Sequence, residues 1–195
     1  LLNLSGNDAL IQWGINLWSK GLDFREERQR AADTGTFVHE CIEKYPQELL
    51  RPMTMSDKDY DRVTKAISNF ANWQTLQKPE YLLREQAFVS ENHRYGGTFD
   101  ALIKLGHNIF IVDYKTSKSI SDTVPIQLAA YMNLITEHTQ FIITSGMVLH
   151  FAHDGKLNIK LYGLHELARA FDAFKAALVV YQFKQGEEIS EELIL

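Results

Sequence analysis

The chain has 195 residues, 45% of them hydrophobic and 23% charged, and its formal net charge is −5 at pH 7. This composition is typical of a folded globular protein, and it argues against a protein that coats nucleic acid through bulk positive charge. The single cysteine, Cys41, excludes an internal disulfide and a four-cysteine iron–sulfur cluster. No stretch has the ~20 apolar residues that cross a membrane, and the polar N-terminus is unlike a signal peptide. We therefore expect a cytoplasmic protein that is neither secreted nor bound to a membrane.

Helical periodicity predicts three helices in the first 80 residues. The first covers 7–20, and the third covers 56–77 with Ser56 as its N-terminal cap. The second follows a charged segment at 25–30. It buries apolar residues spaced three and four apart, which are Val38, Cys41, Ile42, Tyr45 and Leu49. The N-terminal part is therefore expected to be mainly helical.

The pattern changes after residue 80, where short segments rich in β-branched and aromatic residues predict strands. These segments are 81–90, 94–105, 108–116, 140–152 and 156–162. A helix is expected over 122–137, with Pro125 in its first turn, where proline is tolerated. A last amphipathic helix is expected over 163–185. The segment 108–116 is apolar on both faces, as expected of a central strand.

This order of elements predicts an α/β fold in which a central mixed β-sheet is flanked by helices on both faces. No linker-like segment or internal repeat interrupts it, so we expect one domain over 1–195. Its parts are a mainly helical segment at 1–80, a sheet core with one helix at 81–162, and a C-terminal helix at 163–195.

Two neighbouring strands bring acidic residues together. A two-residue turn at Gly106-His107 is plausible because glycine adopts the positive φ that such turns need. That turn pairs Leu105 with Asn108, and counting outward places Asp100 opposite Asp113. Opposed side chains on one face lie about 5 Å apart at Cβ. A three-residue turn would shift the register and remove this pairing.

The pairing of Asp100 with Asp113 has two interpretations. Asp113 and Lys115 are two residues apart on a strand and leave the same face, so the lysine could be a salt-bridge partner on an exposed edge strand. Alternatively, the two carboxylates repel each other unless a cation compensates them, which favours a divalent metal held by oxygen ligands. The apolar run 109–112 argues against an exposed edge, and Gly96-Gly97 permits close approach of a ligand or backbone.

Five short motifs occur in a fixed order along the chain. They are Gly35-Thr36-Phe37-Val38-His39, Glu85, Gly96-Gly97-Thr98-Phe99-Asp100, Asp113-Tyr114-Lys115 and Gln127-Leu128-Ala129-Ala130-Tyr131. Together they resemble the RecB-type branch of the PD-(D/E)XK nuclease superfamily, and the size of the chain is closest to its phage-type exonucleases. The four cysteines that hold an iron–sulfur cluster in some members are absent, so we expect no cluster.

The resemblance implies a restriction-endonuclease-like core and a metal-dependent active site. His39, Asp100 and Asp113 match the metal ligands of the family, with the Tyr114 carbonyl as a fourth. Lys115 matches its catalytic lysine, beside the catalytic carboxylates Asp100 and Asp113. An oxygen-rich site with one imidazole suits Mg²⁺ or Mn²⁺ better than zinc or copper.

Other residues have supporting roles by the same resemblance. Glu85 matches an acidic residue that supports catalysis or binds a second metal. Gln127 and Tyr131 match a pair beside the active site that places the strand being cut, and Thr116-Ser117-Lys118 are expected to contact the substrate. The remaining histidines show no ligand spacing, and we expect them at surface or turn positions: His93, His107, His138, His150, His153 and His165.

The function expected from the resemblance is exonucleolytic hydrolysis of DNA in replication, recombination or repair, in a bacterium or a phage-infected host. DNA is the expected partner, with a homo-oligomer or a recombination or replication protein as a further one. Three alternatives stay open: a structure-selective endonuclease or resolvase on the same fold, a catalytically silent module that binds DNA or protein, and a metal hydrolase acting on other phosphate esters.

Overall fold

The computed structural model describes residues 23–186, and within them five strands form one sheet in the order β1-β2-β3-β4-β5. The strands are β1 (Glu80–Ser90), β2 (Tyr95–Leu105), β3 (Asn108–Lys115), β4 (Ser145–Phe151) and β5 (Leu157–Gly163). β3 and β4 are parallel, and the other neighbouring strands are antiparallel. The mixed sheet is therefore confirmed, and β3, the predicted central strand, lies in its middle.

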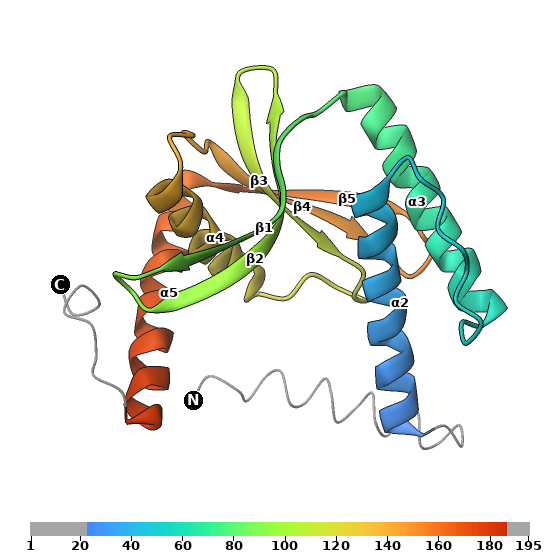
Figure 1. The fold of residues 1–195 in the computed structure, drawn as a ribbon, viewed down its shortest axis with the longest axis horizontal. Helices are drawn as coiled ribbons and strands as arrows, with labels where there is room; N and C mark the ends of the chain where they lie inside the picture. The colour runs from blue at the N-terminus through green and yellow to red at the C-terminus, as the bar shows by residue number, and fades with distance from the viewer. Residues whose placement is uncertain (1–22, 187–195) are drawn as a thin grey trace.

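Helices cover both faces of this sheet. In the described part of the chain they are α2 (Phe24–Lys44), α3 (Asp57–Gln77), α4 (Val124–His138) and α5 (Leu164–Gln185). α2 and α3 lie on one side of the sheet and α4 and α5 on the other (Figure 1). Successive residues of β3 alternate between the two cores, because Val112 packs with α2 and α3 whereas Ile111 packs with α4 and α5. The predicted layers are confirmed.

The ends of α2 follow from local chemistry. Asp23 caps its first turn by accepting the backbone N–H groups of Arg25 and Glu26. The helix ends at Lys44, since the residue before a proline avoids helical backbone angles and Pro46 follows Tyr45. The prediction that the helix reaches Leu49 is therefore wrong, although Leu49 still packs against the core under α2 and α3.

Other boundaries agree with the sequence in most places. Ser56 caps α3 as predicted, with its hydroxyl accepting the N–H of Asp59. β4 begins at Ser145, so the prediction that this strand starts at residue 140 is wrong. The apolar residues 141–143 instead belong to the connection between α4 and β4. The helix predicted at 7–20 lies outside the described residues.

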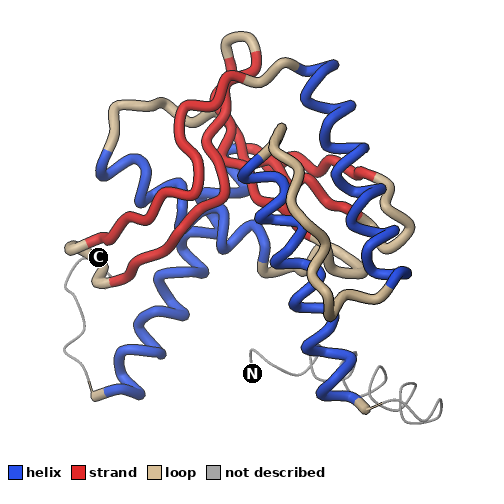
Figure 2. Tube along the Cα trace, turned by 45° about the vertical axis from the view of Figure 1, so that its right-hand side comes forward, coloured by secondary structure: helices blue, strands red, loops and turns tan. Residues whose placement is uncertain are grey.

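The β1–β2 pair continues as a curved ribbon beyond the rest of the sheet and reaches α5 (Figures 1 and 2). The pairing register shifts between Tyr81 and Leu83, and Glu85 has a φ of 42°. A positive φ is rare for a residue with a side chain. This irregular segment of β1 is where the ribbon lies beside the candidate site described below.

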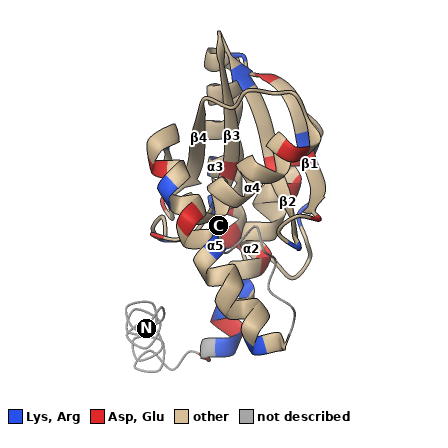
Figure 3. Ribbon diagram, turned by 90° about the vertical axis from the view of Figure 1, so that its left-hand side faces the viewer, with Lys and Arg blue, Asp and Glu red and all other residues tan. Residues whose placement is uncertain are grey.

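Charged residues of both signs are interspersed on the side of the molecule that carries α4 and α5 (Figure 3). This mixture fits the small negative net charge of the chain. None of the described helices combines the length and apolar character needed to cross a bilayer.

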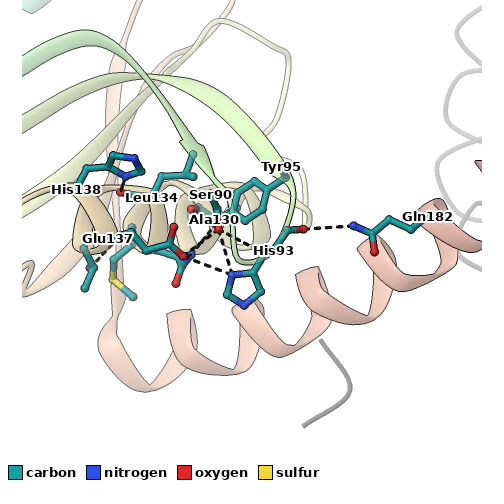
Figure 4. Close-up of polar contacts among 11 residues, drawn as sticks. Ser90, His93, Tyr95, Ala130, Leu134, Glu137, His138 and Gln182 are labelled. Atoms are coloured by element: carbon teal, nitrogen blue, oxygen red, sulfur yellow. Dashed lines mark hydrogen bonds and ion pairs between the residues drawn. The ribbon is translucent and has the colours of Figure 1, made fainter. Parts of the chain in front are cut away.

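A polar network ties the end of the β1–β2 ribbon to α4 and α5 (Figure 4). The Ser90 hydroxyl, which is fully buried, donates to Glu137 Oε1 at 3.0 Å, and the Tyr95 hydroxyl donates to the Ala130 carbonyl at 2.9 Å. From α5, Gln182 Nε2 donates to the His93 carbonyl at 3.3 Å. Two buried or half-buried groups of the ribbon therefore link it to α4.

Candidate active site

Adjacent strands place three carboxylates in a row. The β1–β2 ladder pairs the neighbours of Glu85 with the neighbours of Asp100, so these two carboxylates lie side by side. The β2–β3 ladder begins with the pair Leu105–Asn108, which confirms the predicted two-residue turn and its register. The last pair of this ladder is Ala101–Val112, so Asp100 and Asp113 lie one position beyond it.

Helix α2 adds an imidazole to the row of carboxylates. His39 Nδ1 lies 3.6 Å from Asp100 Oδ1. Among the described residues, His39, Glu85 and Asp100 each offer a ligand atom within 4.8 Å of the others. The structure thus brings Glu85 into the same group as two of the predicted metal ligands, whereas the sequence indicated only a supporting or second-metal role for it.

Backbone groups of Tyr114 hold this arrangement in place. Its N–H donates to Asp100 Oδ2 at 2.6 Å, and its main chain also hydrogen-bonds His39. The rings of His39 and Tyr114 meet edge to face, with their centroids 5.9 Å apart. The Tyr114 main chain therefore lies next to the imidazole, and the assignment of its carbonyl as a metal ligand stays a prediction.

Lys115 connects the carboxylates to α4. Its Nζ donates to Asp113 Oδ1 at 2.8 Å and to Gln127 Oε1 at 3.0 Å. The Gln127 amide in turn donates from Nε2 to the Tyr131 hydroxyl at 3.0 Å. Predicted site residues from β3 and α4 are therefore joined in one hydrogen-bonded chain.

Asp113 is the most buried of the candidate ligands, at 2% relative exposure. Burial and the nearby charge of Asp100 raise its pKa to about 6, against the opposing effect of Lys115. Its Oδ2 is buried and has no hydrogen-bond partner. A buried carboxylate oxygen without a donor is costly unless a cation approaches it, so the donor set fits a hard divalent cation such as Mg²⁺ or Mn²⁺.

The pKa values of His39 and Glu85 also reflect the close spacing of charges in this group. Burial lowers the pKa of His39, but its hydrogen bond to Asp100 and the charges of Asp100 and Asp113 outweigh burial, so the pKa is raised overall. Burial raises the pKa of Glu85, and the charge of Asp100 raises it further. Negative charge is thus concentrated around the imidazole, which is the electrostatic setting that favours a bound cation.

A shallow cleft of about 410 Å³ opens next to these groups. It is lined by Gly35, Thr36, His39, Tyr114, Lys115, Thr116 and Ser117. Gly35 leaves room there for the Thr116 side chain, because an added Cβ would lie 2.8 Å from Thr116 Oγ1. The predicted substrate contacts Thr116 and Ser117 therefore line the cleft. Lys118 follows them as an exposed residue and is not part of the lining.

Two residues that the sequence did not indicate hold the loop after β3. The Arg62 guanidinium of α3 donates to the Thr116 carbonyl, and His150 Nε2 of β4 lies 2.7 Å from the Ser117 carbonyl. The prediction that His150 is a surface or turn residue is wrong, since its exposure is 6%. No sequence signal marked these contacts, because they join segments 54 and 33 residues apart.

Comparisons with known proteins identify the family. The sequence profile of the PD-(D/E)XK nuclease superfamily matches residues 17–193, and a search of curated proteins gives no match. The crystal structure of a candidate exonuclease from Eubacterium rectale aligns with a TM-score of 0.57 and 13% sequence identity, over 82% of this chain and 69% of that chain. The structure of SSO0001 aligns with a TM-score of 0.39 and 12% identity, over 75% of this chain and 85% of that chain, which supports no conclusion. The fold is restriction-endonuclease-like, as predicted, and the chain belongs to the PD-(D/E)XK nuclease superfamily.

Proposed function

We propose that this chain is a Mg²⁺- or Mn²⁺-dependent DNA exonuclease of the RecB-type branch. The observation that carries the proposal is the position of Lys115, whose ammonium is held between Asp113 and Gln127 next to the group of His39, Glu85 and Asp100. A salt bridge on an exposed edge would not need Asp113 to be buried in a central strand.

Each residue has a task in phosphodiester hydrolysis. A divalent ion bound by His39, Glu85, Asp100 and Asp113 would polarise the scissile phosphate and lower the pKa of a bound water. Lys115 presents a fixed positive charge that stabilises the negative charge developing on the phosphate oxygens. Asp113 would keep that ammonium in place, which the 2.8 Å contact between Lys115 Nζ and Asp113 Oδ1 supports.

Positive charge next to the cleft supports a nucleic-acid substrate despite the net charge of the chain. Lys58, Arg62 and His153 are among the residues that line a cavity of about 310 Å³ between α2, α3 and the β4–β5 turn. The pKa of His153 is lowered by burial and then by the surrounding charges of Arg62, Lys118, His150 and Lys58. The acidic residues of this cavity already have cationic partners: Glu27 and Asp59 pair with Arg30, and Asp61 pairs with Lys65. We therefore assign phosphate contacts to Lys58 and Arg62, next to the loop at 116–118.

Digestion of end-labelled single- and double-stranded DNA tests the proposal. We expect activity with Mg²⁺ or Mn²⁺, none with chelator, and a loss of about 10²- to 10³-fold in kcat for Lys115→Met. The control is Lys184→Gln, which changes an exposed lysine near the C-terminal end of α5. Wild-type activity in the Lys115→Met variant, with unchanged circular dichroism, would remove the proposed mechanism.

Circular single-stranded DNA separates an exonuclease from an endonuclease. An exonuclease degrades the linear form and leaves the circle intact, whereas a structure-selective endonuclease opens the circle. A silent binding module would bind both forms and cut neither, with any divalent metal.

A further inference from the structure

Gly97 and Tyr131 are in unusually close contact. Gly97 lies on β2, three residues before Asp100, and Tyr131 lies on α4. A Cβ added to Gly97 would be 2.7 Å from Tyr131 Cε1 and 3.4 Å from Cδ1. The tyrosine ring therefore occupies the space that any side chain at position 97 would need.

The hydroxyl of the same ring is the end of the hydrogen-bonded chain that begins at Lys115. Tyr131 accepts from Gln127 Nε2, and Gln127 Oε1 accepts from Lys115 Nζ. A lysine ammonium can only donate, so the amide oxygen must face it. The amide nitrogen then needs an acceptor on its other side, and the Tyr131 hydroxyl provides it. The Tyr131 hydroxyl thus holds the amide in the orientation that Lys115 requires.

We propose that Gly97 is a positioning residue for Lys115, acting through Tyr131 and Gln127. Because Gly97 has no side chain, the Tyr131 ring can lie against β2. In this position its hydroxyl accepts a hydrogen bond from Gln127. This inference rests on the proposed nuclease function only in that Lys115 is the catalytic lysine. It also assigns Gln127 and Tyr131 to the orientation of the lysine, and not to direct contact with the DNA strand.

The network at the end of the β1–β2 ribbon explains why a methyl group at position 97 would displace the ring. Tyr95 on β2 bonds to the Ala130 carbonyl on α4, next to Tyr131. Ser90 bonds to Glu137, about two turns beyond Ala130 on the same helix. Since α4 is bonded to the ribbon at both points, moving the helix away would strain both bonds, and we expect the Tyr131 ring to shift instead.

Gly97→Ala and Tyr131→Phe are the test variants, with Gly163→Ala as the matched control. An added Cβ at Gly163 has nothing within 4 Å. We expect kcat to fall by about ten- to a hundredfold in both test variants, because a misplaced reacting group loses that much. The Kd for DNA in chelator should stay unchanged. If Gly97 or Tyr131 contacted the DNA strand, its substitution would instead raise this Kd.

The double variant Gly97→Ala/Tyr131→Phe decides whether Gly97 acts through the tyrosine hydroxyl. If it does, the double variant is no slower than Tyr131→Phe alone. The inference would be overturned if Gly97→Ala lowered kcat in the Tyr131→Phe background as much as it does in the wild type. Full activity of Gly97→Ala alone would also overturn it. If Gly97→Ala does not fold, Tyr131→Phe alone decides, because an unchanged kcat in that variant also overturns it.

A measurement without metal or DNA separates this inference from the proposed function. Reductive methylation of the metal-free protein, followed by mass spectrometry, reports how firmly each lysine ammonium is held. We expect Lys115 to react about tenfold faster in Gly97→Ala and Tyr131→Phe than in the wild type, as expected for a lost hydrogen bond to a charged group. Lys156, whose side chain is 80% exposed, should react at one rate in all variants. Unchanged Lys115 reactivity in both would refute the positioning role even if the protein cuts DNA.

Discussion

Replacing Asp113 with asparagine should stabilise the metal-free protein, although it removes a candidate ligand. The pKa of Asp113 is raised from 3.8 to about 6 by burial and by the charge of Asp100. A tenfold change in an equilibrium constant corresponds to about 1.4 kcal/mol, so the ionised carboxylate destabilises the folded chain by about 3 kcal/mol at neutral pH. Asparagine has nearly the same shape and no charge, and it avoids this penalty.

The pH dependence gives the effect a distinct signature. Below pH 3.8 the carboxyl is protonated in both folded and unfolded chains, so the penalty is absent. As the pH rises, the unfolded chain ionises first and stability is lost, until the folded carboxyl also ionises near pH 6. The stability gained by Asp113→Asn should therefore grow between about pH 4 and 6 and stay constant above.

Urea unfolding in chelator, repeated across this pH range, measures the difference. Asp172→Asn is the control, since Asp172 is an exposed carboxylate on α5. Adding Mn²⁺ should stabilise the wild type, by about 2.7 kcal/mol at a hundredfold excess over its Kd, and should stabilise Asp113→Asn much less. A variant less stable than the wild type at pH 7 in chelator, or a difference independent of pH, would refute the reasoning.

Three further predictions concern packing and charge. Gly35→Ala should lower kcat about tenfold by pushing on Thr116 Oγ1, and in a Thr116→Ala background it should have no further effect on kcat. Lys58→Gln should reduce the salt dependence of DNA binding by about 0.7 to 0.9 in log–log slope, measured by fluorescence anisotropy, while Lys184→Gln leaves it unchanged. Phe70→Ala removes a fully buried ring and should lower the free energy of unfolding by about 3–5 kcal/mol, seen as a lower urea midpoint.

The sequence by itself determined the elements and the hairpin register. Ser56 caps α3 and the Gly106-His107 turn pairs Leu105 with Asn108, because caps and turns depend on residues a few positions apart. The continuous apolar run within 108–116 likewise predicted a strand covered on both faces. The same local reasoning was wrong for the apolar residues 141–143. They form a connection instead of a strand, because contacts with distant parts of the chain decide their conformation.

Only the tertiary structure decided which side chains of different layers meet. Glu85 joins His39 and Asp100 because the register of β1 against β2 places it opposite Asp100 and α2 packs beside both strands. The contact of Gly97 with Tyr131, and that of Arg62 with the loop at 116–118, depend on how closely helices pack on the sheet. Such distances are set by the fit of many side chains between layers. These distances cannot be derived from residue type and spacing along the chain.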